Sequence, residues 1–517
     1  MNNIKILWVD DEIDMLRPHI IFLASKGYKV DTINNGNDAL DLISVNNYDL
    51  IFLDENMPGL SGIEVLSLIN KINPLLPVIM ITKSEEESIM EDAIGSNIAD
   101  YLIKPVNPNQ ILLAIKKNID SRKIISNKNS SEYQQEFREI GIELSNDLDF
   151  KEWISIYKKI VTWELKLEKS TDEGILGILQ IQKEEANKLF SNYVCENYET
   201  WVGGKIGKKP CQSHIVVKDK ILPMVESGKT TFLFVIDNLR YDQWKTIYPI
   251  LSEYFRIENE DIYYSILPTT TQYARNALFS GLMPSMISSL YPHYWTEESD
   301  EGTKNQFEEQ LFAEQLKRLG SKIKFSYNKV LSFNSGKKLQ ENLHTLMHND
   351  LNIIVYNFVD MLSHARTEME VIRELASDEK AYRSLTLSWF NNSPLLAMMK
   401  YVAEKGGKMI ITTDHGSIKV KKPIKVIGDK NTNTNLRYKF GKSLEYKEKE
   451  VFSVRKPENI FLPKPNLSTS YIFCKDTDFF VYPNNFNYFA SFYKDSFQHG
   501  GISLEEMLIP LITLNAK

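Results

Sequence analysis

The sequence has few cysteines and no long apolar run. Its 517 residues include three cysteines, Cys195, Cys211 and Cys474. They form no metal-type pair, and a small odd number argues against a disulfide framework and for a reducing compartment. The apolar stretch at residues 4–9 stops at Asp10, and no run of about 20 apolar residues follows it. We therefore expect a soluble cytoplasmic protein without a signal peptide or a transmembrane segment.

The sequence also lacks an excess of positive charge. Its net charge of −7 provides no general attraction to nucleic acid backbones. No helix-turn-helix pattern or basic domain follows the first 120 residues or so. We therefore expect no direct DNA binding.

The length and composition predict several folded domains. Hydrophobic residues make up 43% of the chain and charged residues 25%, as in ordinary globular proteins. A chain of this length exceeds what one hydrophobic core normally supports. The pattern of strands and helices predicts an α/β multidomain protein. We expect an α/β domain at 1–122, an all-helical linking domain at 123–208 and a large α/β domain at 209–517.

The first segment alternates short β-branched runs with helical stretches, which predicts a five-stranded parallel (βα)5 sheet. Polar residues follow the strand candidates, at the sheet edge where functional groups collect. Three carboxylates would meet there, from Asp10, Asp11 and Asp54, and such a cluster calls for Mg²⁺. Thr82 and Lys104 are suited to hold phosphoryl oxygens while Asp54 attacks phosphorus. The strand candidates are Ile4–Val9, Val30–Ile33, Asp49–Leu53, Pro77–Ile81 and Ala99–Ile103.

This segment resembles the receiver domains of two-component response regulators. The resemblance lies in WVDDE (8–12), FLDENMPGLSG (52–62), MITKSEEE (80–87) and DYLIKPVNP (100–108). It implies phosphorylation by a sensor histidine kinase, with Asp54 as the phosphoacceptor. It also implies a phosphorylation switch and a Mg²⁺ site. The switch comprises Thr82, Tyr101 and Lys104, and the Mg²⁺ ligands are Asp10, Asp11, Asp54 and the backbone carbonyl of Asn56.

The middle segment has apolar residues at helical spacing and no cluster of candidate ligands or nucleophiles. Trp153, Ile156 and Ile160 are examples of this spacing. We expect a helical bundle used for packing, dimerisation or signal transmission. The polar run Ser126–Ser131 suggests a hinge between this bundle and the first domain.

In the large domain, three apolar runs each end in an aspartate, namely Thr231–Ile236, Leu351–Val359 and Lys408–Thr413. They are followed by Asp237, Asp360 and Asp414. Three of the eight histidines, His364, His415 and His499, fall in the same motifs or in a fourth one near the C-terminus. Carboxylates and imidazoles suit Zn²⁺, and six such ligands suit two zinc ions about 4 Å apart.

A nucleophile for such a site is available among three consecutive threonines, Thr269 to Thr271, which precede a helical stretch. A hydroxyl beside zinc becomes acidic and can attack phosphorus. Each threonine could instead simply cap the helix. Arg275, one helical turn later, is either a clamp on a phosphate oxygen or a structural arginine.

The large domain resembles the alkaline phosphatase superfamily, in particular its PglZ-type branch. The resemblance lies in FLFVIDNLRYDQW (232–244), LPTTTQYARNALFSG (267–281), NFVDMLSH (357–364), ITTDHG (411–416) and QHGGIS (498–503). It implies that Thr271 is the nucleophile and that two zinc ions are bound. One zinc would be held by Asp237, Asp414 and His415 together with Thr271, and the other by Asp360, His364 and His499.

The order of the three parts resembles the PorX-type response regulators associated with type IX secretion. This implies a zinc-dependent phosphodiesterase or phosphatase acting on nucleotide-type phosphodiesters, such as linear or cyclic oligonucleotides. It also implies contact with a type IX secretion component or a sigma factor. We expect phosphorylation to produce a homodimer. The alternative is a signalling adaptor in which the zinc domain docks partners without catalysis.

Overall fold

The structure is a computed structural model of the chain. It divides into two compact units, Met1–Tyr133 and Gln134–Lys517. The residues described are 4–73, 76–83, 98–115, 118, 121–168, 173–204, 208–225, 229–297, 303–362, 370–376, 378–429 and 432–517. None of the helices formed by these residues combines the length and the apolar character that a membrane span requires.

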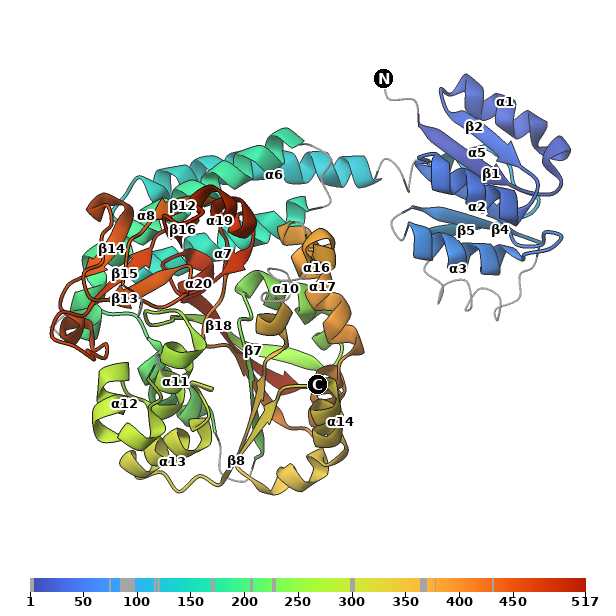
Figure 1. Cartoon of the computed structure of the whole chain (residues 1–517). Coiled ribbons are helices and arrows are strands. Elements are labelled where there is room, and N and C mark those ends of the chain that lie inside the picture. Colours follow the sequence, from blue (N-terminus) through green and yellow to red (C-terminus); the bar gives the residue numbers. More distant parts are fainter. Residues whose placement is uncertain are drawn as a thin grey trace. The chain divides into compact units, whose positions relative to one another are not determined.

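The first unit contains a sheet of five parallel strands in the order β2-β1-β3-β4-β5 (Figure 1). All residues of β3 and β4 are buried, as expected for a parallel sheet covered by helices on both faces. The predicted receiver sheet is confirmed. Its strands are β1 Lys5–Val9, β2 Lys29–Ile33, β3 Leu50–Asp54, β4 Val78–Thr82 and β5 Asp100–Ile103, and its helices are α1 Arg17–Ser25, α2 Gly36–Val45, α3 Gly62–Ile72 and α5 Pro108–Ile115.

The expected hinge at Ser126–Ser131 is wrong, because a single helix, α6 (Ser121–Leu144), runs through it. The second half of this helix is anchored by the buried side chains of Tyr133 and Ile140. Helix formation is cooperative, so polar residues beside an anchored segment can continue the same helix. Polarity alone did not distinguish a polar helix from a hinge.

Two further helices complete the linker, α7 (Phe150–Leu167) and α8 (Glu173–Val202). The predicted apolar face of α7 is buried, including Trp153, Ile156 and Ile160. These side chains belong to the same hydrophobic core as the sheet of the large domain. The helical linker and the large domain therefore share one core.

The large domain is built on a six-stranded sheet in the order β7-β18-β10-β6-β9-β8. Strands β10, β6, β9 and β8 are mutually parallel, and β18 is antiparallel to both of its neighbours. The carboxyl ends of the four parallel strands therefore meet at one edge of the sheet. The bounds are β6 Thr231–Ile236, β7 Phe255–Tyr264, β8 Phe325–Val330, β9 Leu351–Tyr356, β10 Lys408–Thr412 and β18 Leu508–Ala516.

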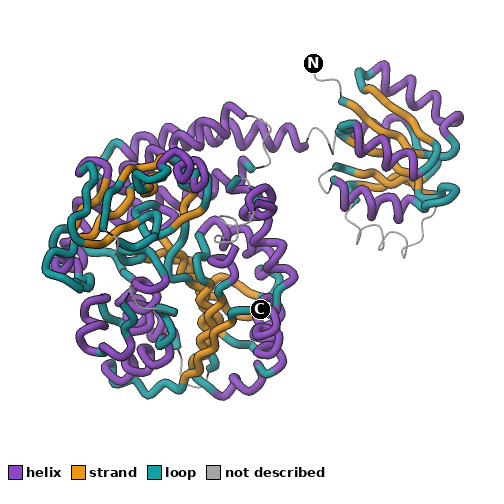
Figure 2. The backbone as a smooth tube through the Cα atoms, in the orientation of Figure 1, coloured by secondary structure: helices purple, strands orange, loops and turns teal. Residues whose placement is uncertain are grey.

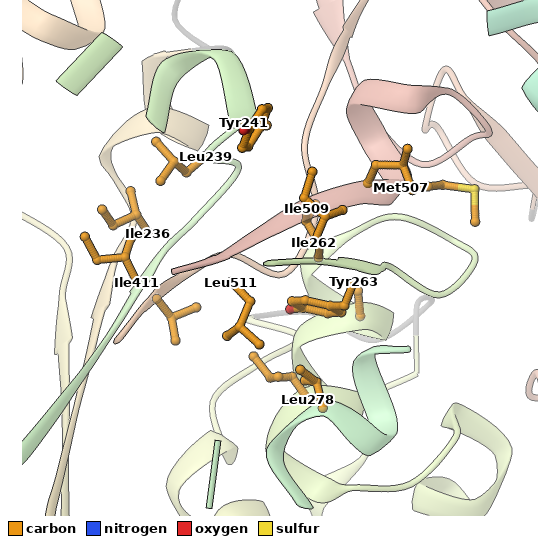
Figure 3. Close-up of a cluster of buried hydrophobic side chains, with 14 of the residues drawn as sticks. Ile236, Leu239, Tyr241, Ile262, Tyr263, Leu278, Ile411, Met507, Ile509 and Leu511 are labelled. Carbon is orange, nitrogen blue, oxygen red and sulfur yellow. The ribbon is translucent and has the colours of Figure 1, made fainter. Parts of the chain in front are cut away.

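Buried side chains from both faces of this sheet form the core of the domain. Figure 3 shows part of it, where Ile236, Ile411 and Leu511 come from neighbouring strands and Tyr263 and Leu278 pack nearby. Figure 2 shows the strands as a band between helices. This core fixes the sheet edge that carries the candidate ligands.

Helices flank the large sheet, with α11 to α13 on one side and α14, α16 and α17 on the other in Figure 1. The helices are α9 Ser213–Val216, α10 Tyr241–Leu251, α11 Asn276–Ser280, α12 Pro284–Leu290, α13 Glu308–Arg318, α14 Phe333–Glu341, α16 Glu370–Leu375, α17 Glu379–Asn392, α18 Pro394–Glu404, α19 Phe486–Tyr493 and α20 Leu504–Met507. Three small sheets precede the C-terminal strand. They pair β11 Ile418–Lys419 with β17 Phe497–Gln498, β12 Lys422–Lys425 with β16 Asp478–Val481, and β15 Ser470–Cys474 with both β13 Tyr438–Gly441 and β14 Val451–Val454.

Candidate functional sites

The receiver unit gathers three carboxylates at the carboxyl ends of β1 and β3. Asp10 and Asp11 follow β1, Asp54 ends β3, and their oxygens lie within 4.8 Å of one another. Asp10 and Asp54 are buried and Asp11 is exposed. The cluster therefore offers carboxylate oxygens, the ligands that Mg²⁺ prefers, and its exposed side leaves room for the water molecules that Mg²⁺ retains.

Lys104 lies between two of these carboxylates. Its Nζ is 3.0 Å from Asp10 Oδ2 and 2.9 Å from Asp54 Oδ1. Burial raises the pKa of Asp54, and Asp10 adds to this effect, while Lys104 opposes it. The ammonium group therefore helps to keep Asp54 ionised, which a carboxylate nucleophile requires.

The other predicted receiver residues occupy the ends of the neighbouring strands. Thr82 is the buried last residue of β4, and its hydroxyl donates a hydrogen bond to Glu55, a partner that the sequence did not indicate. Tyr101 on β5 exposes 37% of its surface. Asn56 is exposed two residues after Asp54. The buried threonine and the exposed tyrosine thus stand on adjacent strands.

In the large domain, strand register brings Asp237 and Asp414 together. β6 and β10 are parallel, with Thr412 opposite Val235, so the aspartates two residues beyond each strand residue stand at the same edge. His415 joins them, and ligand atoms of all three side chains lie within 4.8 Å of one another and are buried. Two carboxylates and one imidazole are ligands that a cation such as Zn²⁺ accepts.

Thr271 lies directly against this group, at the first position of a short π-helical turn. Its Oγ1 is 3.2 Å from His415 Nε2 and 3.4 Å from Asp237 Oδ1. The two preceding threonines differ, since Thr269 Oγ1 donates to a backbone carbonyl and Thr270 Oγ1 makes no hydrogen bond with the described residues. Of the three candidate hydroxyls, that of Thr271 contacts the predicted ligands.

A second group lies beside the first. His499 Nε2 is 3.6 Å from Asp360 Oδ1, and the rings of His499 and His415 are stacked, with centroids 4.2 Å apart. His499 Nδ1 is 3.2 Å from the carbonyl oxygen of Thr269, which leaves Nε2 facing Asp360. His364, the sixth predicted ligand, lies outside the described residues.

The group of Asp237, Asp414 and His415 fits a metal ion because its buried negative charge is only partly compensated by the surrounding residues. Asp414 Oδ2 is buried and accepts no hydrogen bond from the part of the chain that the structure describes. Burial raises the pKa of Asp237, with Arg275 opposing and Asp414 reinforcing the shift. Burial also acts to raise the pKa of Asp414, but His415 and Arg275 outweigh it and hold this pKa below its usual value. A cation between the two carboxylates would remove their repulsion.

Arg275 is fully buried and lies against this group. Its Nη1 is 2.9 Å from Asp237 Oδ2, and its Nε is 2.8 Å from Glu308 Oε1. Glu308 is itself buried and lies 3.2 Å from Lys329 Nζ. No motif in the sequence connects Glu308 and Lys329 to the strand-end aspartates, so the sequence did not indicate them.

A cavity of about 610 Å³ opens in front of the two groups. Thr271, Asp237, Asp360 and His499 all line it, and so does Arg275. Most of the other lining residues are polar or aromatic, and they are Thr270, Gln272, Lys304, Asn305, Asn357, Thr434, Asn435, Leu436, Tyr438, Tyr493 and Gln498. The candidate nucleophile and ligands thus face a space that a small polar molecule can enter.

Three protein-family models match successive parts of the chain. The response regulator receiver domain matches residues 6–116, and the PorX response regulator linker domain matches residues 123–202. The BREX system PglZ alkaline phosphatase-like domain matches residues 216–514, which is more than half of the chain. A receiver domain implies a histidine kinase as partner, and the third match makes the buried Asp–Asp–His group a candidate hydrolase centre.

Individual relatives match shorter stretches. The transcriptional regulatory protein ResD of Bacillus subtilis is 37% identical over 115 residues, which are 22% of this chain and 48% of ResD. The alginate biosynthesis transcriptional regulatory protein AlgB of Pseudomonas putida is 35% identical over 123 residues, which are 24% of this chain and 28% of AlgB. The chain therefore spans less than half the length of these relatives.

Solved receiver structures are similar to a comparable stretch. A CheY-like receiver domain protein from Methanospirillum hungatei has 28% identity and a TM-score of 0.23, covering 23% of this chain and 96% of its own. A receiver domain protein from Clostridium thermocellum has 31% identity and a TM-score of 0.22, covering 23% of this chain and 98% of its own.

Proposed function

The chain belongs to the PglZ alkaline phosphatase-like family and has the architecture of a PorX-type response regulator, and from this premise we propose that it is a phosphoric ester hydrolase with two zinc ions, controlled by phosphorylation of Asp54. The observation that carries the proposal is the position of Thr271. Its hydroxyl is within 3.4 Å of both His415 and Asp237 and faces the cavity.

Residues of this chain could bind the two zinc ions that the proposed hydrolysis requires. Asp237, Asp414 and His415 would hold one zinc ion, and Asp360 and His499, with His364, would hold the other. Zinc bound by such ligands acts as a Lewis acid that makes a nearby hydroxyl acidic and draws charge from phosphoryl oxygens.

Thr271 is the nucleophile in this proposal, because its Oγ1 is the hydroxyl that lies beside the ligands. The oxygen attacks phosphorus and loses its proton, the bond from phosphorus to the leaving oxygen breaks, and the leaving oxygen takes up a proton. The phosphoryl group, which in a diester keeps its second ester bond, is then bound to Thr271 Oγ1. Water then cleaves the bond between phosphorus and Thr271 Oγ1 and restores the hydroxyl. The burial of Asp237 and Asp414 excludes bulk water from the ligand side of the nucleophile.

The substrate class that we propose is a nucleotide-type phosphodiester, such as a linear or cyclic oligonucleotide. The cavity has room for a nucleotide, and its lining includes Lys304 and the aromatic side chains of Tyr438 and Tyr493. A lysine can pair with a phosphate, and an aromatic ring can stack on a base. This lining supports a nucleotide over a purely aliphatic phosphate ester.

The receiver half supplies the control. A sensor histidine kinase phosphorylates Asp54 with Mg²⁺ held by Asp10, Asp11, Asp54 and the carbonyl of Asn56, and the switch residues Thr82, Tyr101 and Lys104 respond. We propose that the phosphorylated protein dimerises and that it acts on type IX secretion through a secretion component or a sigma factor. The PorX linker match supports this assignment.

The proposal is tested by a metal analysis combined with a screen of nucleotide esters, with and without beryllofluoride as phosphoryl mimic. We expect two zinc ions per chain, zinc-dependent hydrolysis of phosphodiesters, and faster hydrolysis together with dimer formation when the mimic is present. Zinc without hydrolysis of any ester would instead support the adaptor alternative. Unchanged sedimentation and an unchanged rate with the mimic would refute the proposed control.

Replacing the phosphoacceptor is expected to remove that control. Asp54→Asn keeps the size of the side chain but cannot form an acyl phosphate. We expect no phosphate incorporation from a small phosphodonor with Mg²⁺ and no response to it in sedimentation, while hydrolysis keeps its unstimulated rate. Asp49→Asn is the matched control, because Asp49 precedes the same strand and its carboxylate contacts the Lys5 backbone, away from the acidic cluster. Phosphate incorporation into Asp54→Asn would place the phosphoacceptor elsewhere.

A further inference from the structure

Helix α8 of the linker carries buried polar side chains that contact the large domain, and Asn187 and Ser191 are two of them. Asn187 Nδ2 donates to Glu505 Oε2 at 3.0 Å, and Asn187 Oδ1 accepts from the backbone nitrogen of Leu504 at 2.8 Å. Ser191 Oγ donates to the carbonyl of Ile502 at 3.1 Å. Buried amides and hydroxyls with specific partners fix position, since an unpaired one is destabilising. Helix α8 therefore holds residues 502–505, the start of the segment 502–506.

This segment in turn contacts the loop that follows His415. The backbone nitrogen of Gly416 donates to the carbonyl oxygen of Glu506 at 3.2 Å. A Cβ at Gly416 would lie 2.0 Å from the carbonyl oxygen of the residue before Glu506. No side chain fits between the two backbones at Gly416, so the segment packs directly against the backbone beside His415.

The same segment also contacts the loop that carries His499. The backbone nitrogen of Gly501, two residues after His499, donates to Glu506 Oε1 at 2.9 Å. Glu506 is fully buried, and its other oxygen is 2.6 Å from Arg437 Nη2. The carboxylate is therefore held in place, and it fixes the Gly501 amide.

Because the two histidine rings are stacked with an interplanar angle of 16°, their relative position depends on both loops. We propose that Asn187 and Ser191 are positioning residues that, through residues 502–506, hold His415 and His499 in the arrangement that binds the metal pair. This inference rests on the proposed zinc hydrolase. In this inference the linker helix α8 supplies residues that orient the metal ligands. A movement of α8 would therefore change the geometry of the metal site.

Amide hydrogen exchange in the full chain tests the positioning directly and without any metal. Asn187→Ala frees the Leu504 amide in any case, so the informative amides are Gly416 and Gly501, which Asn187 does not touch. We expect both to exchange about tenfold faster or more, as for the loss of a buried hydrogen bond. Asn197→Ala is the matched control on the same helix, because the hydrogen bond that its side chain makes with the described residues lies within the helix, to the carbonyl of Tyr193. It should leave both amides unchanged.

Zinc affinity gives the second readout. Replacement of residues that orient metal ligands typically weakens metal binding about 10- to 100-fold, and we expect Asn187→Ala to weaken zinc binding by this factor and Asn197→Ala to leave it unchanged. Ser191→Ala, a smaller change, should show the same directions if Asn187→Ala does not fold. Unaltered exchange at Gly416 and Gly501 in both Asn187→Ala and Ser191→Ala would overturn the inference. If the unmodified protein binds no zinc, the proposed function fails, and the exchange result still decides whether α8 positions the histidine loops.

Discussion

Thr271→Val should lower the rate of phosphoric ester hydrolysis by about 1000-fold or more, since loss of a nucleophile removes the covalent route altogether. Valine has nearly the shape of threonine, so the π-helical turn and the ligands around it should remain in place. Zinc content and thermal stability should therefore stay close to those of the unmodified protein. The measurements are kcat/KM on a nucleotide ester, metal content and thermal unfolding of the same preparation.

Two neighbouring substitutions make this test specific. Thr271→Ser retains a hydroxyl and should keep the rate within about tenfold of the unmodified protein. Thr270→Val removes a hydroxyl that makes no hydrogen bond with the described residues, and it should also change the rate by less than tenfold. A large loss in Thr270→Val with full activity in Thr271→Val would show that the neighbouring threonine is the nucleophile.

The sequence was most informative where function follows directly from local pattern. Each of the five predicted receiver strands lies within one residue of an observed strand at both ends. The run Thr231–Ile236 coincides with β6, and the aspartate after it reaches the predicted group. Parallel strands place their carboxyl ends at one edge, so residues far apart in sequence could be brought together from strand assignment alone.

The sequence was uninformative where partners are selected by tertiary packing. Asn187 contacts Glu505, 318 residues away, and on α8 it is one polar residue among many. Glu308 lies on α13, which no motif links to the sheet edge. Its carboxylate nevertheless pairs with Arg275, which also contacts Asp237. Periodicity identifies which face of a helix is buried, but it does not identify what that face meets.

The two interpretations that the sequence allows for Arg275 illustrate the same limit. Its spacing from Thr271 suited a clamp on phosphate as well as a structural arginine. The structure places its Nη1 2.9 Å from Asp237 Oδ2 and gives it Glu308 as a second partner. Its contacts therefore stabilise the charge of a candidate ligand, which spacing along a helix could not reveal.

Removing the metal should abolish hydrolysis and make stability depend on pH. We expect a chelator to lower the rate about 1000-fold or more and zinc, but not Mg²⁺, to restore it, since the donor set contains imidazole. Burial raises the pKa of Asp237 in the folded, metal-free protein. The folded state then retains a proton that the unfolded chain loses above about pH 4.

The metal-free protein should therefore lose stability as pH rises from about 4 toward the raised pKa of Asp237, by up to about 1.4 kcal/mol per pH unit. Asp414, whose pKa is lowered, acts in the opposite sense, but only below about pH 4. Zinc takes the place of the proton, so its stabilising effect should grow with pH and reach about 4 kcal/mol at a thousandfold excess over its dissociation constant. Urea unfolding from pH 5 to 8, with and without zinc, measures both trends. Asp237→Asn cannot titrate and should flatten the metal-free curve; a metal-free stability that rises across this range would show that Asp237 is not the proton-binding group.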